Sequence, residues 1–158
     1  MLKLLVLSDS HNRINLMSRA AEREKPDAVA HLGDHIADAH RLKAVMPDTA
    51  FYMVSGNCDF APGKTAELTV TLDGVTIYMT HGHIHGVKSS LDGLISCARK
   101  NGADLALYGH THIPLLQSAG KLRVMCPGQM ERHGANQSAT YGVVTIERGA
   151  FDCRIERL

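Results

Sequence analysis

The chain has 158 residues, of which 44% are hydrophobic and 21% charged, and its formal net charge is +1. These values predict one globular domain over residues 1–158 and exclude a disordered chain. Lys and Arg are scattered, so no basic surface for duplex nucleic acid or for a membrane is expected. The first apolar run, Leu4 to Leu7, is too short for a signal peptide or a membrane span, and we expect a cytoplasmic protein.

The first part of the chain alternates short apolar strands with helices. The predicted elements are strand 2–7, helix 14–24, strand 28–32, helix 37–43 and strand 51–54. This alternation predicts right-handed crossovers and a partly parallel sheet.

The remainder of the chain consists mostly of predicted hairpins, and Asp73-Gly74 gives the strongest turn signal. The predicted elements are strands 67–72 and 75–80, helix 90–100, and strands 105–108, 115–118, 122–125, 140–147 and 151–155. We expect these later hairpins to form a second sheet that packs on the first. The predicted fold class is therefore α/β, a four-layer α/β/β/α sandwich of two mixed sheets flanked by helices.

Polar residues follow five of these strands at the point where each strand ends. In chain order they are Asp9 and His11, Asp34, Asn57, His81, and His110 and His112. Ligands of open α/β sheets bind outside the carboxyl ends of the strands, so five such ends in one sheet region would gather seven oxygen or nitrogen donors. Glycines at the same ends, such as Gly33 and Gly56, let the backbone turn sharply beside a bound ion.

Seven donors exceed the three or four protein ligands of a single catalytic zinc. They suit two ions about 3.5–4 Å apart that share a bridging carboxylate. Carboxylate, amide and imidazole together favour manganese, iron or zinc over magnesium or calcium. Each motif alone also fits an ordinary turn, and the prediction depends on all five occurring in order. The four cysteines, which have no CxxC spacing, are expected to be free thiols: Cys58, Cys97, Cys126 and Cys153.

The motifs resemble those of the calcineurin-like metallophosphoesterases, whose pattern is D-x-H, G-D, G-N-H-[DE], a later histidine and G-H-x-H. Within that superfamily the chain is similar to the small YfcE-like phosphodiesterases, from Leu2 to about Gly142. The resemblance implies the four-layer fold and two divalent ions, manganese first, with iron or zinc as alternatives. It also implies a ligand set: Asp9, His11 and His112 for the first ion, Asp34 as the bridge, and Asn57, His81 and His110 for the second.

Two segments depart from the broad family. Cys58 follows Asn57 where the broad family has a histidine that helps to protonate the leaving group, although the small subfamily commonly has this cysteine too. Because a neutral thiol is a weak acid, cleavage of poor leaving groups is in doubt. Residues 126–129 read Cys-Pro-Gly-Gln where the subfamily usually has Asn-Pro-Gly-Ser, and this loop is expected to lie near the metals.

Other polar residues are candidates for supporting roles. Asp59 can orient Asn57 or a neighbouring histidine, and His83 is a candidate for a substrate contact or a proton donor, as His85 is to a smaller extent. Arg13 and Arg132 are candidates for binding a substrate phosphate. His31 lies inside a predicted strand, where we expect a hydrogen-bonded core histidine.

The predicted reaction is hydrolysis of a phosphodiester by metal-activated hydroxide. The expected substrate is a small phosphodiester or a nucleotide-like molecule, and a homo-oligomer is expected. Two alternatives stay open: a phosphomonoesterase with the same metals, and a non-catalytic metal-binding scaffold that resembles the retromer subunit of this fold.

Overall fold

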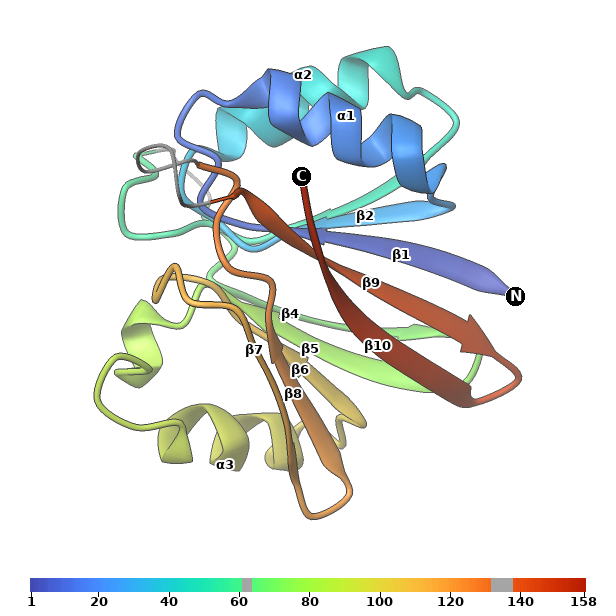
Figure 1. Cartoon of the computed structure of the whole chain (residues 1–158). Coiled ribbons are helices and arrows are strands. Elements are labelled where there is room, and N and C mark those ends of the chain that lie inside the picture. Colours follow the sequence, from blue (N-terminus) through green and yellow to red (C-terminus); the bar gives the residue numbers. More distant parts are fainter. Residues whose placement is uncertain (61–63, 132–137) are drawn as a thin grey trace.

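Two five-stranded sheets lie face to face in the computed structural model, which describes residues 1–60, 64–131 and 138–158 (Figure 1). The first sheet has the order β10-β9-β1-β2-β3. Its strands are β1 (Leu2–Leu7), β2 (Ala28–His31), β3 (Ala50–Met53), β9 (Thr140–Glu147) and β10 (Ala150–Arg157). β1, β2 and β3 are parallel, whereas β9 runs antiparallel to both β1 and β10, so the sheet is mixed.

The second sheet has the order β4-β5-β6-β8-β7. Its strands are β4 (Glu67–Leu72), β5 (Val75–Thr80), β6 (Leu105–Leu107), β7 (Leu115–Ala119) and β8 (Leu122–Cys126). β5, β6 and β8 are parallel, and the two outer strands pair antiparallel to their neighbours.

Helices cover the outer face of each sheet, which completes the four predicted layers (Figure 1). α1 (Ile14–Glu24) and α2 (Ile36–Val45) lie on the first sheet, and α3 (Asp92–Lys100) lies on the second. A short 3₁₀ helix, η1 (His83–His85), follows β5. The fold class predicted from the sequence is therefore confirmed.

Alternation along β1 explains how one strand serves two cores. Leu4 and Val6 point into the cluster between the sheets, while Leu5 and Leu7 pack with Met17 of α1. Successive side chains of a strand point to opposite faces, so a strand covered on both sides must be apolar throughout. A third cluster joins the second sheet to α3.

The sequence-based assignment of the last hairpin to the second sheet is wrong. β9 pairs with β1 in the first sheet, with Leu4 opposite Val144, and β10 pairs with β9. Local periodicity identifies a strand but carries no information on its partner. The sequence does not predict η1, because its three residues are too few to show a helical pattern. It is bounded by Gly82 at φ 103° and Gly86 at φ 63°. α2 extends beyond its predicted ends at both sides, and α3 begins two residues late.

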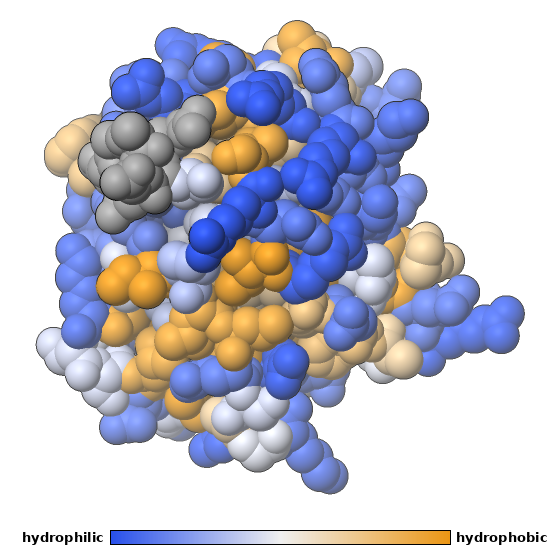
Figure 2. All heavy atoms as spheres, in the orientation of Figure 1, coloured by the Kyte–Doolittle hydropathy of each residue, from blue (hydrophilic) through white to orange (hydrophobic). Residues whose placement is uncertain are grey.

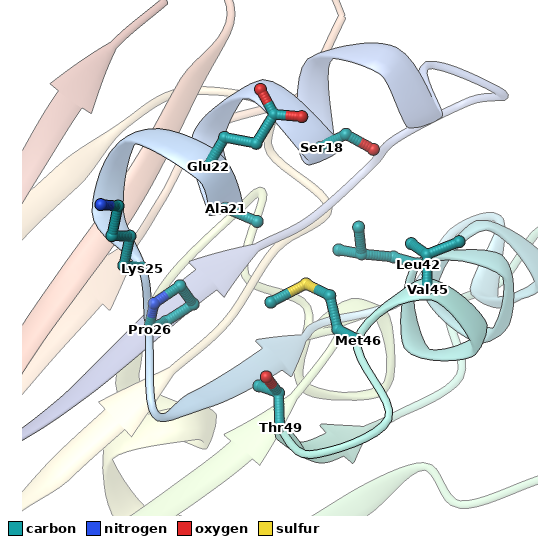
Figure 3. A pocket seen from close by; sticks show the side chains of 9 residues that line it. All are labelled: Ser18, Ala21, Glu22, Lys25, Pro26, Leu42, Val45, Met46 and Thr49. Atoms are coloured by element: carbon teal, nitrogen blue, oxygen red, sulfur yellow. The ribbon is translucent and has the colours of Figure 1, made fainter.

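The surface shows two features away from the strand ends. In Figure 2, apolar side chains gather around β7 and β10, between charged regions. A groove of about 500 Å³ lies between α1 and α2, where Ala21, Leu42 and Met46 are among the lining residues (Figure 3). It includes Pro26 and Thr49, which precede β2 and β3, so it lies at the edge of the sheet opposite the carboxyl ends. Among the described residues, no helix is long and apolar enough to cross a bilayer.

Candidate metal centre

The carboxyl ends of β1, β2, β3, β5 and β6 meet at one edge of the sandwich. The first three strands belong to one sheet and the other two to the second. The donors therefore come from both sheets, whereas the sequence predicts a single sheet region. A hydrogen bond joins the two halves, because the backbone amide of His110 donates to Oδ2 of Asp9 at 3.1 Å.

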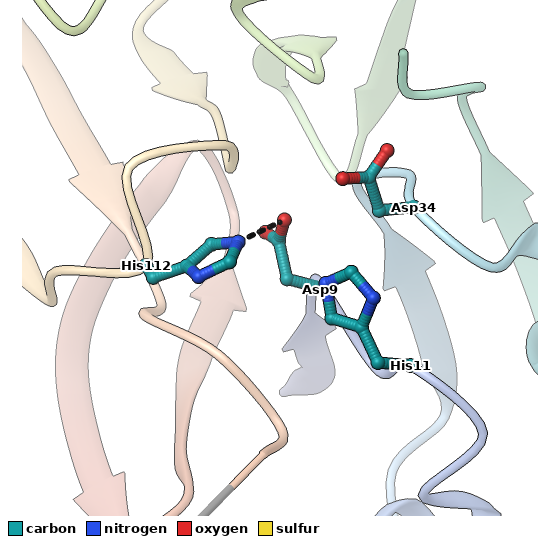
Figure 4. A group of neighbouring side chains, drawn as sticks. All are labelled: Asp9, His11, Asp34 and His112. Atoms are coloured by element: carbon teal, nitrogen blue, oxygen red, sulfur yellow. Dashed lines mark hydrogen bonds and ion pairs between the residues drawn. The ribbon is translucent and has the colours of Figure 1, made fainter. Parts of the chain in front are cut away.

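One group of predicted ligands comprises Asp9, His11, Asp34 and His112 (Figure 4). One ligand atom of each lies within 4.8 Å of those of the other three. Nε2 of His112 is 3.0 Å from Oδ1 of Asp9, and the rings of His11 and His112 are 5.6 Å apart. Figure 4 shows Asp9 between His112 on one side and Asp34 on the other.

The remaining predicted ligands, Asn57, His81 and His110, form a second group near the two carboxylates. Nε2 of His81 is 3.1 Å from Oδ1 of Asn57 and 3.5 Å from Oδ2 of Asp34. The ring of His110 is 5.0 Å from that of His81. Nδ1 of His81 lies 2.7 Å from the carbonyl oxygen of Leu32, and donation to it leaves Nε2 free as a ligand. Asp34 therefore lies close to both groups of donors, as does Asp9, whose Oδ1 is 4.0 Å from Nε2 of His81.

Two buried histidine nitrogens lack hydrogen-bond partners within the described ranges: Nε2 of His11 and Nδ1 of His83. A buried nitrogen without a partner is costly unless a cation or a water satisfies it. The unpaired atom of His11 belongs to a residue of the Asp9–Asp34–His112 group, so the residues present fit a divalent ion that takes carboxylate and imidazole ligands.

Hydrogen bonds and nearby positive charge keep the two carboxylates ionised despite their burial. Burial would raise the pKa of Asp34, but the side chain of His81 and the backbone amide of Cys58 hydrogen-bond to it and hold its pKa well below the usual range. Burial opposes ionisation of Asp9 too, yet the hydrogen bond from His112 and the charge of His81 lower its pKa. Both side chains are thus anions at neutral pH, the form that binds cations.

The backbone at the site adopts conformations that side chains disfavour. Five of the seven predicted ligands have positive φ: Asp9 at 54°, His11 at 43°, Asp34 at 57°, His110 at 69° and His112 at 61°. Such residues each cost of order 1–3 kcal/mol and cluster at functional sites, where surrounding structure holds them. This strain is independent evidence that these positions serve a function.

Two glycines leave space for the carboxylates. A Cβ on Gly56 would lie 2.1 Å from Oδ1 of Asp34, and a Cβ on Gly109 would lie 2.0 Å from Oγ of Ser8 and 2.9 Å from Oδ2 of Asp9. Any larger residue at either position would displace a predicted ligand or the group that supports it.

Asp59 holds the loops and does not point at the ligands. Its buried carboxylate accepts hydrogen bonds from three backbone amides, those of Asp34 at 2.9 Å, Gly56 at 2.8 Å and Ile36 at 2.8 Å. These contacts make it a positioning residue for the two loops after β2 and β3, whereas we had predicted that it orients Asn57 or a histidine.

The other candidates from the sequence occupy varied positions. His83 lies beside the centre, with its ring 5.5 Å from His81 and 6.1 Å from His110. Arg13 is exposed, and Nη2 lies 4.0 Å from Glu131. Arg132 lies outside the described residues. The loop of residues 126–129 does come near the centre, since Gln129 lines a hollow of about 300 Å³ together with His112 and Arg157.

Sequence reasoning missed a buried network that supports the Asp9–His11 loop. Ser10 Oγ donates to Oδ2 of Asp38 at 2.8 Å, and the amide of Asn12 donates to the same oxygen at 2.8 Å. Nε2 of His31 lies 3.2 Å from Ser10 Oγ, and the amide of Gly33 donates to Nδ1 of His31. His31 is a hydrogen-bonded core residue, as predicted. No signal could have found Asp38, because an acid near a helix start reads as an ordinary dipole partner.

Residues 2–149 match the calcineurin-like phosphoesterase superfamily domain. The chain belongs to this superfamily. It is 33% identical over 156 residues to the probable metallophosphoesterase YsnB of Bacillus subtilis, a match that covers 97% of this chain and 89% of YsnB. It is 29% identical over 99 residues to the Escherichia coli phosphodiesterase YfcE, over 58% of this chain and 50% of YfcE.

Solved structures agree with this phosphoesterase fold. A Streptococcus pneumoniae protein described as a predicted phosphoesterase aligns with a TM-score of 0.82 at 28% identity, over 99% of this chain and 89% of that one. Vps29 of Entamoeba histolytica aligns with a TM-score of 0.75 at 16% identity, over 99% of both chains. At that identity the second likeness concerns the fold alone. The family and its named relatives indicate a metal-dependent phosphoesterase.

Proposed function

We propose that this protein is a phosphodiesterase that holds two divalent metal ions at the edge shared by the two sheets. The observation that carries the proposal is the position of Asp34, whose carboxylate lies within 4.8 Å of ligand atoms of the first group and 3.5 Å from Nε2 of His81 in the second. Asp9, His11 and His112 would hold one ion, Asn57, His81 and His110 the other, and Asp34 would bridge them. Manganese is the first choice of metal, and iron or zinc fits the same donors.

When bound, such a pair of ions lowers the pKa of a shared water to about 7 and stabilises charge on the attacking and leaving oxygens of a phosphate. The chain's own residues supply the positions. The carbonyl of Leu32 orients His81, and the amide of Cys58 orients Asp34 at 2.9 Å. Asp59 ties the loops after β2 and β3 together through backbone amides.

The leaving group of the substrate has a weak acid beside it. The thiol of Cys58 is exposed, and slight burial together with the nearby carboxylates of Asp34 and Asp59 raises its pKa. A neutral thiol of raised pKa is a poor proton donor. His83 lies next to the predicted ligands, and its Nδ1 has no hydrogen-bond partner in the part of the chain that the structure describes. It is the proposed alternative for a substrate contact or a proton donor.

The hollow beside His112 is the proposed place for one substituent of the diester. Its lining residues include Gln129, whose buried Oε1 has no hydrogen-bond partner among the described residues, and Arg157. An amide acceptor and a guanidinium suit a polar or anionic substituent, as in a nucleotide-like diester. Arg157 is thus a substrate-binding candidate in addition to Arg13 and Arg132.

Metal content tests the two-ion centre. Fully loaded protein should carry at least two transition-metal ions per chain, as measured by elemental analysis after mild dialysis. Asp34→Ala should lose more metal than His112→Ala, because a bridging carboxylate serves both ions. Asp48→Ala, which changes an exposed acid just before β3, at the opposite edge of the sheet from these loops, is the control. Equal losses in the Asp34 and His112 variants would contradict the bridging role.

Rates over diesters of graded leaving-group pKa test the chemistry. The wild type should favour good leaving groups such as activated aryl esters, with alkyl esters and most monoesters slower. Cys58→His should narrow the gap, since general acid catalysis contributes about 10²–10⁴-fold and matters most for poor leaving groups. Cys58→Ser is the control. A flat dependence in the wild type would mean that another acid is present, and His83 would be examined next.

Two other candidates stay open, a non-catalytic metal-binding scaffold and a phosphomonoesterase with the same metals. A metal-loaded protein that hydrolyses no diester would favour the scaffold, and a preference for monoesters would favour the phosphomonoesterase. The homo-oligomer stays a prediction. A measurement of the molar mass in solution by light scattering would test it.

A further inference from the structure

A second cluster of metal-binding side chains lies outside the proposed catalytic centre, between β4, η1 and α3. One ligand atom from each of Glu67, His85 and Cys97 lies within 4.8 Å of the other two. Nε2 of His85 is 2.8 Å from Oε1 of Glu67, and Sγ of Cys97 is 3.7 Å from the same oxygen. None of the three belongs to the donors assigned to the catalytic ions.

These separations are close to those around a bound zinc ion. Zinc bonds of about 2.0 Å to nitrogen or oxygen and 2.3 Å to sulfur, at tetrahedral angles, place ligand atoms roughly 3.3–3.7 Å apart. The sulfur–oxygen distance of 3.7 Å lies at the upper end of that range, whereas the nitrogen–oxygen distance of 2.8 Å is shorter and must widen to admit an ion. The side chain of Glu67 is 39% exposed, so its carboxylate can rotate slightly to admit an ion.

The polar groups of this cluster converge on one carboxylate oxygen. Tyr78 Oη, His85 Nε2 and Cys97 Sγ all lie within hydrogen-bond reach of Oε1 of Glu67. Without a cation, His85 can donate to the tyrosine hydroxyl, 2.9 Å away, while the tyrosine and the thiol donate to the carboxylate. With a cation present, the imidazole and the thiolate turn lone pairs to the ion, and only the tyrosine hydroxyl needs to donate.

The surrounding structure holds the three ligands in place. Tyr78 is buried, and its hydroxyl lies 2.9 Å from His85 Nε2 and hydrogen-bonds to Glu67, which orients the carboxylate. Gly93 in the first turn of α3 lets the helix approach η1 closely, since a Cβ there would lie 3.2 Å from the carbonyl oxygen of His85. A thiolate, an imidazole and a carboxylate together favour zinc over magnesium or calcium.

We propose that Glu67, His85 and Cys97 form a mononuclear zinc site that is separate from the catalytic centre. Binding releases the thiol proton of Cys97 to solvent, and the ion then joins β4, η1 and α3. Because η1 also carries His83, this site fixes the segment that leads from the catalytic centre to α3.

Cobalt substitution tests the site independently of catalysis. Chelator-treated protein is titrated with Co²⁺, and the thiolate-to-cobalt charge-transfer absorption in the near ultraviolet is followed. The proposed catalytic ligands include no thiolate, so this band reports a cysteine ligand. We expect the band in the wild type and in Asp34→Asn, and its loss in Cys97→Ser and in His85→Gln. Circular dichroism establishes that each variant is folded.

Cys58→Ser is the matched control, because it removes the exposed thiol beside the catalytic centre. The band should persist in this variant. In the same variant, saturating Zn²⁺ should protect one thiol per chain from a thiol reagent, since Cys126 and Cys153 are already buried. The proposal is overturned if folded wild type gives no band, if the band depends on Cys58 and not on Cys97, or if zinc protects no thiol.

Discussion

His31 makes the stability of the fold depend on pH. The side chain is fully buried under the Asp9–His11 loop, and burial lowers its pKa to about 4 against the opposing charges of Asp59, Asp9 and Asp38. The amide of Gly33 donates to Nδ1, an arrangement that only an imidazole without a proton on that atom can accept. The folded state therefore holds His31 neutral.

The size of the effect follows from the two pKa values. The unfolded chain binds a proton at His31 below pH 6.5, whereas the folded chain does so only near pH 4. Between these values the unfolded state binds more protons, so the free energy of unfolding falls as the pH falls. One pKa unit corresponds to about 1.4 kcal/mol, so lowering the pH from about 7 to about 4 removes about 3 kcal/mol through this residue.

Urea unfolding of chelator-treated protein at a series of pH values measures this loss without interference from metal release. His31→Gln keeps a hydrogen-bonding side chain that does not titrate, and it should lose about 3 kcal/mol less than the wild type over the same pH range. His40→Gln, which changes an exposed histidine of α2, should follow the wild type. If the His31 and wild-type curves run parallel, the assignment of a neutral buried imidazole is refuted.

Three further changes have defined outcomes. Glu24→Ala removes a buried carboxylate that accepts a hydrogen bond from Arg154 at 2.8 Å. Urea unfolding should show that the free energy of unfolding falls by about 3 kcal/mol, and by less if the partly exposed Arg154 turns to solvent. Gly56→Ala should lower metal content, because its Cβ would collide with a ligand carboxylate. Gly149→Ala, in the turn between β9 and β10, also has open space around the new Cβ and lies away from every proposed ligand, so it should keep its metal even if its positive φ costs some stability. Equal metal content in the two variants would contradict the steric argument. Cys58→Ser should retain both ions in elemental analysis, and loss of metal would make this thiol a ligand.

Much of the candidate centre could be predicted because its residues immediately follow apolar strands. Asp9 and Asp34 follow neighbouring parallel strands, and the carboxyl ends of such strands meet at one edge whatever the rest of the fold does. The hydrogen bonds from backbone amides to Asp59, which fix the loop that carries Asp34, could not be predicted. The sequence of a turn does not indicate which distant amides a carboxylate will accept from.

Contacts between distant elements were likewise beyond the sequence. Exposed and partly buried side chains alternate along β4, and Glu67 fits this pattern as an exposed residue. Cys97 lies on an amphipathic helix. Neither residue stands out in the sequence before the two elements pack together. The family resemblance predicts that the loop of residues 126–129 lies near the metals. It does not predict that the side chain of Gln129 lines the hollow beside His112.

The pairing of β1 with β9 has a consequence for how the chain folds. β1 is the central strand of its sheet, yet one of its two neighbours is formed by residues 140–147. While a nascent chain lacks those residues, the backbone groups along one side of β1 have no partner and present an edge that can pair with another chain. Contacts so far apart in sequence also close slowly, because loop-closure entropy is lost before the pairing is gained. Truncation or slow synthesis of the last hairpin should therefore promote aggregation through the strand that carries Asp9 at its end.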